Sequence, residues 1–110
     1  MSFRQYVLTL NGSAQQLSTV FAAAEKESNP KGPALIGLSL QPSSSNANPV
    51  WVGDANVAAN VAAVRLSSAT TGVPPAPWLR ELSGSYPFSL GDYWVLGTNG
   101  EKLHIGIDIE

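Results

Sequence analysis

Turn-forming residues divide this chain into short segments, and their spacing is the strongest constraint on its fold. Pairs built from glycine, proline, asparagine, aspartate, serine or threonine recur along its 110 residues, at 11–12, 29–30, 32–33, 42–43, 53–54, 71–72, 74–75, 84–85, 91–92 and 99–100. Short segments between regular turns favour a sandwich or barrel of strands over a helical fold.

The last segment has the clearest strand pattern. From Leu103 to Ile109 every second residue is leucine or isoleucine, and histidine, glycine and aspartate lie between them. This alternation predicts an antiparallel strand with one face in the core and the other in water or against a partner. Asn99-Gly100 precedes it and favours a two-residue type I′ turn, in which both residues have positive φ. We therefore expect Tyr93–Thr98 and Glu101–Ile109 to form a hairpin.

Strand-like runs also occur earlier in the chain, at 6–10, 15–21, 36–40 and 50–52. In the third run Ile36, Leu38 and Leu40 are expected to share one apolar face. We expect loops at 24–32 and 68–77, which are rich in polar, small or proline residues.

Residues 54–64 leave two alternatives open. Val57, Val61 and Val64 have helical spacing, and Asp54 can cap a short helix at its N-terminus. A helix of about three turns is marginal without tertiary packing. The alternative is a loop followed by a strand at 61–66.

Charged residues are scarce. They make up 13% of the chain, about half the ~25% typical of soluble domains, and between Gly32 and Leu79 only Asp54 and Arg65 are ionisable. We expect another protein to cover part of this surface. The net charge of −2 argues against binding to nucleic-acid phosphates, and no apolar run approaches the ~20 residues that span a bilayer.

The length predicts a single domain over 1–110. The N-terminal residues lack the apolar core of a signal peptide, so we expect synthesis in the cytoplasm.

No catalytic constellation is visible. The single histidine, His104, and the nearest carboxylate on the same strand face, Asp108, are about 13 Å apart at strand rise, too far for a hydrogen bond. Cysteine is absent, and Asp54 and Asp92 each follow a glycine, as turn-capping aspartates do. We expect no enzyme activity, no cofactor and no metal site.

The aromatic residues can pack in the core, contact another subunit or form a stacking platform for a ligand. Tyr93 and Trp94 are adjacent, so on a strand they point to opposite faces and at least one leaves the core. Tryptophan and tyrosine are common interface anchors. The alternative is a sugar-stacking platform that uses Trp51, Trp78 or Trp94.

Several motifs carry a resemblance to a known group of proteins. They lie, in chain order, at Asn11–Leu17, Leu35–Gln41, Asn48–Asp54, Gly72 and Tyr93–Ile107. Together they resemble the small β-sandwich structural proteins of tailed bacteriophages, the capsid decoration (cement) head proteins among them. The chain departs from that pattern at Asn56–Ser68, which is rich in alanine, and at Pro77–Glu81.

The resemblance implies a fold and a role. The fold is an all-β, antiparallel, jelly-roll-like sandwich. The role is that of a homotrimer on the capsid exterior of the virion, made in the host cytoplasm, that clamps major capsid subunits without covalent bonds. Candidate interface residues are Trp78, Trp94 and an N-terminal arm at 1–6, comprising Ser2, Phe3, Arg4, Gln5 and Tyr6. The alternatives are a tail or baseplate component and a carbohydrate-binding module.

Overall fold

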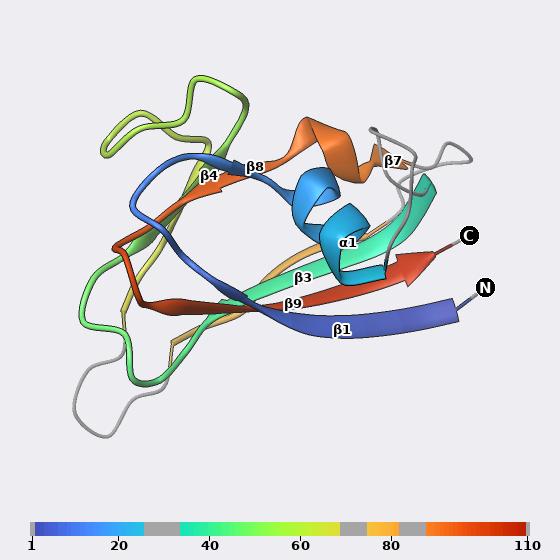
Figure 1. Ribbon diagram of the computed structural model, residues 1–110, viewed down its shortest axis with the longest axis horizontal. Helices are drawn as coiled ribbons and strands as arrows, with labels where there is room; N and C mark the ends of the chain where they lie inside the picture. The colour runs from blue at the N-terminus through green and yellow to red at the C-terminus, as the bar shows by residue number, and fades with distance from the viewer. Residues whose placement is uncertain (1, 26–33, 69–74, 82–87, 110) are drawn as a thin grey trace.

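Two antiparallel sheets stack face to face (Figure 1). The computed structural model describes residues 2–25, 34–68, 75–81 and 88–109. The first sheet has the strand order β1-β9-β3-β6, and β7 also pairs with β3. Its strands are β1 (Ser2–Thr9), β9 (Lys102–Ile109), β3 (Ala34–Pro42), β6 (Trp78–Glu81) and β7 (Phe88–Ser89). The second sheet, in the order β2-β8-β4-β5, consists of β2 (Gln15–Gln16), β8 (Trp94–Leu96), β4 (Val50–Gly53) and β5 (Val64–Leu66).

The strands pair in a nested order. Strand β4 pairs with β5, β3 with β6, β2 with β8 and β1 with β9, and all four pairs are antiparallel. With β7 set aside, this is a long two-stranded ribbon rolled over so that successive pairs fall in alternate sheets, which is the jelly-roll topology. The prediction of an all-β, jelly-roll-like sandwich is confirmed.

The inner faces of the two sheets form one hydrophobic core. On β9, Leu103, Ile105 and Ile107 are buried, as their alternation predicted. Strand β4 contributes Val50 and Val52. Because every second residue points inward, the intervening residues of these strands make up the two outer faces of the sandwich.

Strand β3 departs from simple alternation at its start. Leu38 and Leu40 are buried as predicted, but Leu35 rather than Ile36 joins them in the core. The register between β3 and β9 shifts between Leu35 and Gly37. Such a bulge inserts one residue and moves the preceding side chain to the opposite face.

The predicted C-terminal hairpin is wrong. Strands β8 and β9 belong to different sheets, so the turn between them crosses the sandwich. The Glu101 amide donates to the Thr98 carbonyl at 3.0 Å, and of the Asn99-Gly100 pair only Gly100 has a positive φ, of 90°. The turn is anchored by Leu10, whose amide donates to the Glu101 carbonyl and whose carbonyl accepts from the Gly100 amide.

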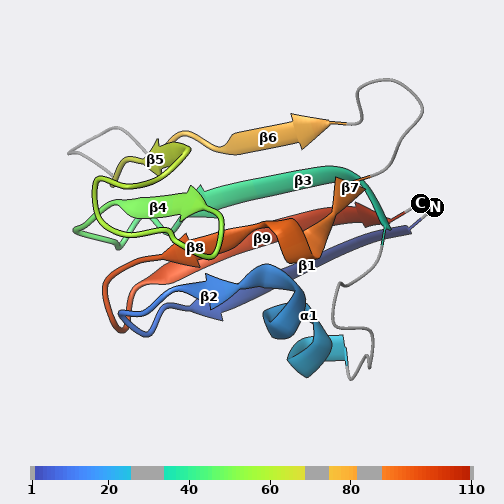
Figure 2. The same ribbon diagram turned by 90° about the horizontal axis from the view of Figure 1, so that it is seen from above.

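The strand predicted at 15–21 is confirmed only for Gln15–Gln16, which form β2, and the prediction is wrong for the remaining residues. Helix α1 (Leu17–Glu25) begins there and buries Leu17 and Phe21, one turn apart. It lies beside β2 and β1, at the open edge between the sheets (Figures 1 and 2). The Phe21 ring packs 6.3 Å from that of Tyr6. Helix α1 also occupies the start of the predicted loop at 24–32, the remainder of which lies outside the described residues.

Residues 54–64 form turns, and the helical alternative is wrong. Asn60 has a φ of 66°, and Ala58 and Val61 exchange two backbone hydrogen bonds. A strand follows, as the other alternative predicted, although β5 begins at Val64. Of the predicted loop at 68–77, only Ser68 and residues 75–77 are described, and none of these is in a helix or strand.

The alternation on β9 predicts unequal effects for two truncations. Ile107→Ala should lower the free energy of unfolding by about 2–5 kcal/mol, because it leaves a cavity in the core. His104→Ala, on the exposed face of the same strand, should change it by no more than about 0.5 kcal/mol. Urea unfolding measures both, and equal losses would contradict the assigned faces.

Candidate protein-interaction surface

The outward side of the β1-β9-β3-β6 sheet, here called the outer face, is the most distinctive surface among the described residues. The register places Gln5, Gly106, Ser39 and Leu79 side by side in one row across all four strands. The outer face comprises Phe3, Gln5, Val7 and Thr9 of β1, Lys102, His104, Gly106 and Asp108 of β9, Gly37, Ser39 and Gln41 of β3, and Leu79 of β6.

Three large apolar side chains on this face are exposed to water. Phe3 is 62% exposed, Val7 52% and Leu79 61%. Single exposed apolar residues are common on monomers, but three on one side of one sheet resemble the apolar centre of a protein interface.

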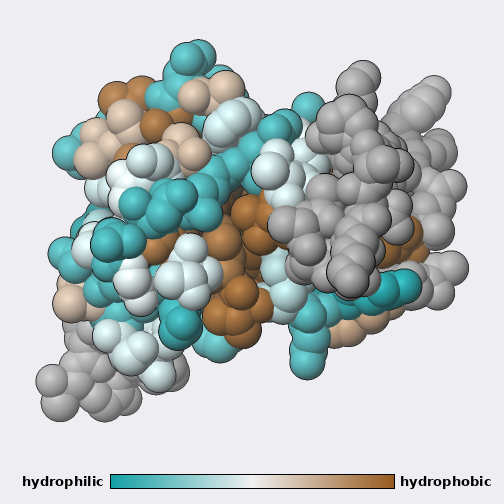
Figure 3. Space-filling model, viewed as in Figure 1, coloured by the Kyte–Doolittle hydropathy of each residue, from teal (hydrophilic) through white to brown (hydrophobic). Residues whose placement is uncertain are grey.

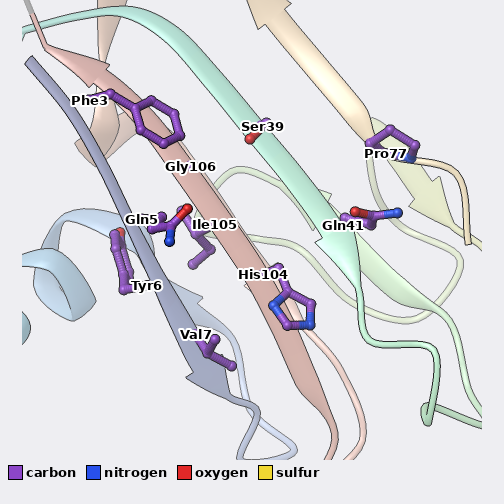
Figure 4. A pocket seen from close by; sticks show the side chains of 10 residues that line it. All are labelled: Phe3, Gln5, Tyr6, Val7, Ser39, Gln41, Pro77, His104, Ile105 and Gly106. Carbon is purple, nitrogen blue, oxygen red and sulfur yellow. The ribbon is translucent and has the colours of Figure 1, made fainter.

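The outer face is hollowed around Gly106. A Cβ atom there would lie 2.6 Å from the Ser39 hydroxyl oxygen and 3.2 Å from the Phe3 ring, so only glycine fits without a shift of its neighbours. Figure 4 shows Phe3 and Ser39 on the strands that flank Gly106. Two shallow hollows share these three residues. One, of about 360 Å³, extends toward His104 and the other, of about 420 Å³, toward Leu79.

Among the described residues of the outer face only Lys102 and Asp108 carry a full charge, and Arg80 also lines the hollow at Leu79. Lys102 is at one end, where its ammonium donates to the Thr9 hydroxyl at 3.1 Å, and Asp108 is toward the other. The middle row carries amide, hydroxyl and apolar groups. A partner can therefore cover it without desolvating an ion, the most expensive step in burying a surface.

The predicted arm at 1–6 lies in this sheet as far as it is described. Residues from Ser2 onward belong to β1 and pair with β9, with Ser2 opposite Ile109. Phe3 and Gln5 lie on the outer face, Arg4 is exposed, and Tyr6 is half-buried against the core. A role for these residues in an interface stays a prediction.

The two predicted tryptophan anchors lie elsewhere. Trp78 is half-buried, packs on the core, and its ring lies 6.0 Å from that of Tyr93. Trp94 lines a hollow of about 530 Å³ at the open edge of the sandwich, together with Leu8 and Val20. Figure 3 shows apolar surface near the centre of that side of the molecule. Neither tryptophan belongs to the outer face, and their role as anchors stays a prediction.

Sequence reasoning missed Val7 and Leu79. The alternation around Tyr6 and Leu8 already contained the signal for Val7, because an outward residue must lie between two inward ones. Leu79 lies between Trp78, which packs on the core, and Arg80, whose guanidinium carbon lies 5.9 Å from the centre of the Tyr93 ring. The short β6 segment gave no pattern from which that direction could be read.

Two tryptophans already have partners on their rings. The Arg65 guanidinium lies over the Trp51 ring at 5.5 Å, and Trp78 packs on Tyr93. The carbohydrate-binding alternative stays a prediction.

The described side chains do not assemble a metal cluster. Within the described ranges no group of three or more histidine, cysteine, aspartate or glutamate residues comes together. The expectation that the chain is not an enzyme stays a prediction. None of the described helices is long and apolar enough to cross a membrane.

Comparisons with known proteins do not assign this chain to a family. No family model matches the chain, and no curated protein matches it. Among solved structures it is similar to a chain of the Cyanophage Pam1 capsid asymmetric unit, with 17% identity and a TM-score of 0.32, over 96% of this chain and 79% of that chain. A likeness at that TM-score carries no argument about fold or function.

The Tyr93 side chain links the two sheets and has a shifted pKa. Burial raises the pKa of its hydroxyl above the usual 10.0, the Arg80 charge partly opposes this rise, and Asp92 adds to it. The unfolded chain therefore loses this proton at a lower pH than the folded chain does. The resulting contribution to stability is complete below pH 10 and is lost as the pH rises through the folded-state pKa.

Tyr93→Phe should remove this dependence on pH. We expect the free energy of unfolding of the wild-type protein to fall more steeply above pH 10 than that of the variant. Urea unfolding at a series of pH values measures both, and the other tyrosines titrate alike in the two proteins. Parallel curves would contradict the assigned burial of the hydroxyl.

Proposed function

We propose that this chain is a bacteriophage virion structural protein that decorates the capsid exterior and holds major capsid subunits together by non-covalent contact. The observation that carries the proposal is the outer face, with its exposed Phe3, Val7 and Leu79 and its uncharged middle row. Such a surface suits contact with protein rather than with phosphate or with a charged substrate.

The energetics of such a contact follow from the exposed side chains. Each of the three apolar residues on the outer face leaves more than half of its surface in water. Covering that remainder contributes roughly 1 kcal/mol or more per residue. One copy then binds modestly, and several copies bound together on a shell gain from multivalency.

The resemblance to phage decoration proteins supports the specific role. It implied a jelly-roll-like sandwich, and the nested strand order is consistent with that expectation. The fold alone cannot carry a function, because jelly rolls occur in capsids, lectins and enzymes alike. The homotrimer and the position on the head rather than the tail are likewise parts of this proposal.

A matched pair of charge substitutions tests the contact. Leu79 and Val61 are exposed to nearly the same extent, 61% and 59%, but only Leu79 lies on the outer face. Leu79→Asp should weaken binding to particles that lack this chain by about tenfold or more, because a buried carboxylate would lose its hydration. Val61→Asp should bind like the wild type, and sedimentation with particles measures both.

Reinforcement of the shell is a second expected outcome. Particles with the wild-type protein bound should release their DNA at a higher temperature than particles without it, because each bound copy must dissociate before the shell opens. An unchanged release temperature with normal binding would contradict the clamping role. Binding to tails and not to heads would favour the tail alternative.

A further inference from the structure

Strand β1 forms an open edge of the first sheet. It is 8 residues long, and its register with β9 is unbroken from Ser2 opposite Ile109 to Thr9 opposite Lys102. Among the described strands it pairs only with β9. No backbone hydrogen bond among the described residues joins its other side to another element, and that side presents a row of backbone donors and acceptors.

Two hydrogen bonds show which residues of β1 direct their backbone groups toward β9 and which direct them outward. The Leu10 amide donates to the Glu101 carbonyl at 2.7 Å, in the same register as the β1–β9 ladder. On the opposite side of β9, the Ser43 amide donates to the Lys102 carbonyl at 3.0 Å. Because bonding direction alternates along a strand, the even-numbered residues of β1 bond to β9. The backbone groups of Phe3, Gln5 and Val7 point away from the sheet.

No proline, lysine or bulge interrupts this edge, although helix α1 lies beside it between the sheets. Natural edge strands carry prolines, lysines or bulges, or they are very short. Residues 2–9 contain no proline and no lysine, their register has no bulge, and Arg4 is their one residue charged at neutral pH. Phe3, Gln5 and Val7 are all exposed. A strand edge of this length without a proline, lysine or bulge is a template for another strand.

We propose that β1 pairs antiparallel with β1 of a second copy of this chain, about a two-fold axis at Gln5. Gln5 then lies opposite Gln5 of the second copy, and Phe3 lies opposite Val7 of the second copy. These pairs use the outward-pointing backbone groups of both strands. The two sheets join into one, and their outer faces become continuous across the axis.

Complementarity favours this register over the two neighbouring ones. A two-fold axis at Arg4 would place the two guanidinium groups directly opposite each other, and like charges in that position are destabilising. An axis at Tyr6 would place Phe3 opposite Thr9 and Gln5 opposite Val7, which mixes polar with apolar groups. The axis at Gln5 pairs amide with amide and apolar with apolar, and it places Arg4 opposite Tyr6.

This pairing does not depend on the proposed function. A two-fold contact cannot by itself build a three-fold trimer, so in a trimeric protein it would join neighbouring trimers. On a shell that holds many copies close together, such links would form a network around the particle.

Cysteine trapping tests the register directly, because the chain has no cysteine of its own. In Gln5→Cys the two Cα atoms would lie about 5.5 Å apart, within disulfide range. In Thr9→Cys, the control on the same strand, they would lie about 27 Å apart. Under mild oxidation of concentrated protein, without particles, Gln5→Cys should form linked dimers about tenfold faster than Thr9→Cys.

A mixture distinguishes the registers. Phe3→Cys and Val7→Cys together should form the mixed disulfide in preference to either symmetric one, whereas an axis at Tyr6 would instead link Phe3→Cys with Thr9→Cys. Equal rates for Gln5→Cys and Thr9→Cys, or a preference for another pair, would overturn the proposal.

Gln5→Pro gives an independent measurement. The Gln5 amide points away from β9, so a proline there leaves the β1–β9 ladder intact and blocks only the added strand. We expect an unchanged Tm and a lower average mass in sedimentation of concentrated protein. An unchanged mass would overturn the pairing. Failure of these tests leaves the shell contact standing, and failure of Leu79→Asp to weaken particle binding leaves the pairing standing.

Discussion

Strand β9 is the element on which the rest of the structure depends. It pairs with β1 on one side and with β3 on the other. Its leucine and isoleucine side chains fill the centre of the core, and its glycine at 106 leaves the hollow on the opposite face. One alternating sequence therefore determines both how the sandwich closes and what surface it presents, and a change in that register would exchange the two faces.

Local patterns predicted most strands but not their partners. Alternation in 103–109 and 50–52 requires a half-buried strand, whatever else the chain does. The Asn99-Gly100 turn was misread because a turn dipeptide does not determine whether the strands it joins share a sheet. The direction in which β9 leaves this turn depends on hydrogen bonds to Leu10, which is far away in the sequence. The helix at 17–25 was missed although Leu17, Val20 and Phe21 have the spacing of one helix face, which is a local signal in the sequence.

The candidate surface was only partly readable. Scarce charge predicted that some surface is covered, and the covered region was expected at the N-terminus and at the tryptophans. The structure places Phe3, Val7 and Leu79, three of the four large exposed apolar residues described, in one sheet and sets Trp78 against Tyr93. Side chains distant in sequence, such as Phe3 and Leu79, come to one face only through the order β1-β9-β3-β6. That order is a property of the whole fold, and no short segment encodes it.

The central claim is that the outer face is covered by protein when the chain acts. A reconstruction of a particle with this chain bound, as the proposed function requires, tests the claim most directly. The account predicts density for a neighbouring protein against β1, β9 and β3, with Phe3 and Leu79 inside the contact. A bound chain whose outer face points into solvent, with its contacts on the β2-β8-β4-β5 sheet, would contradict it.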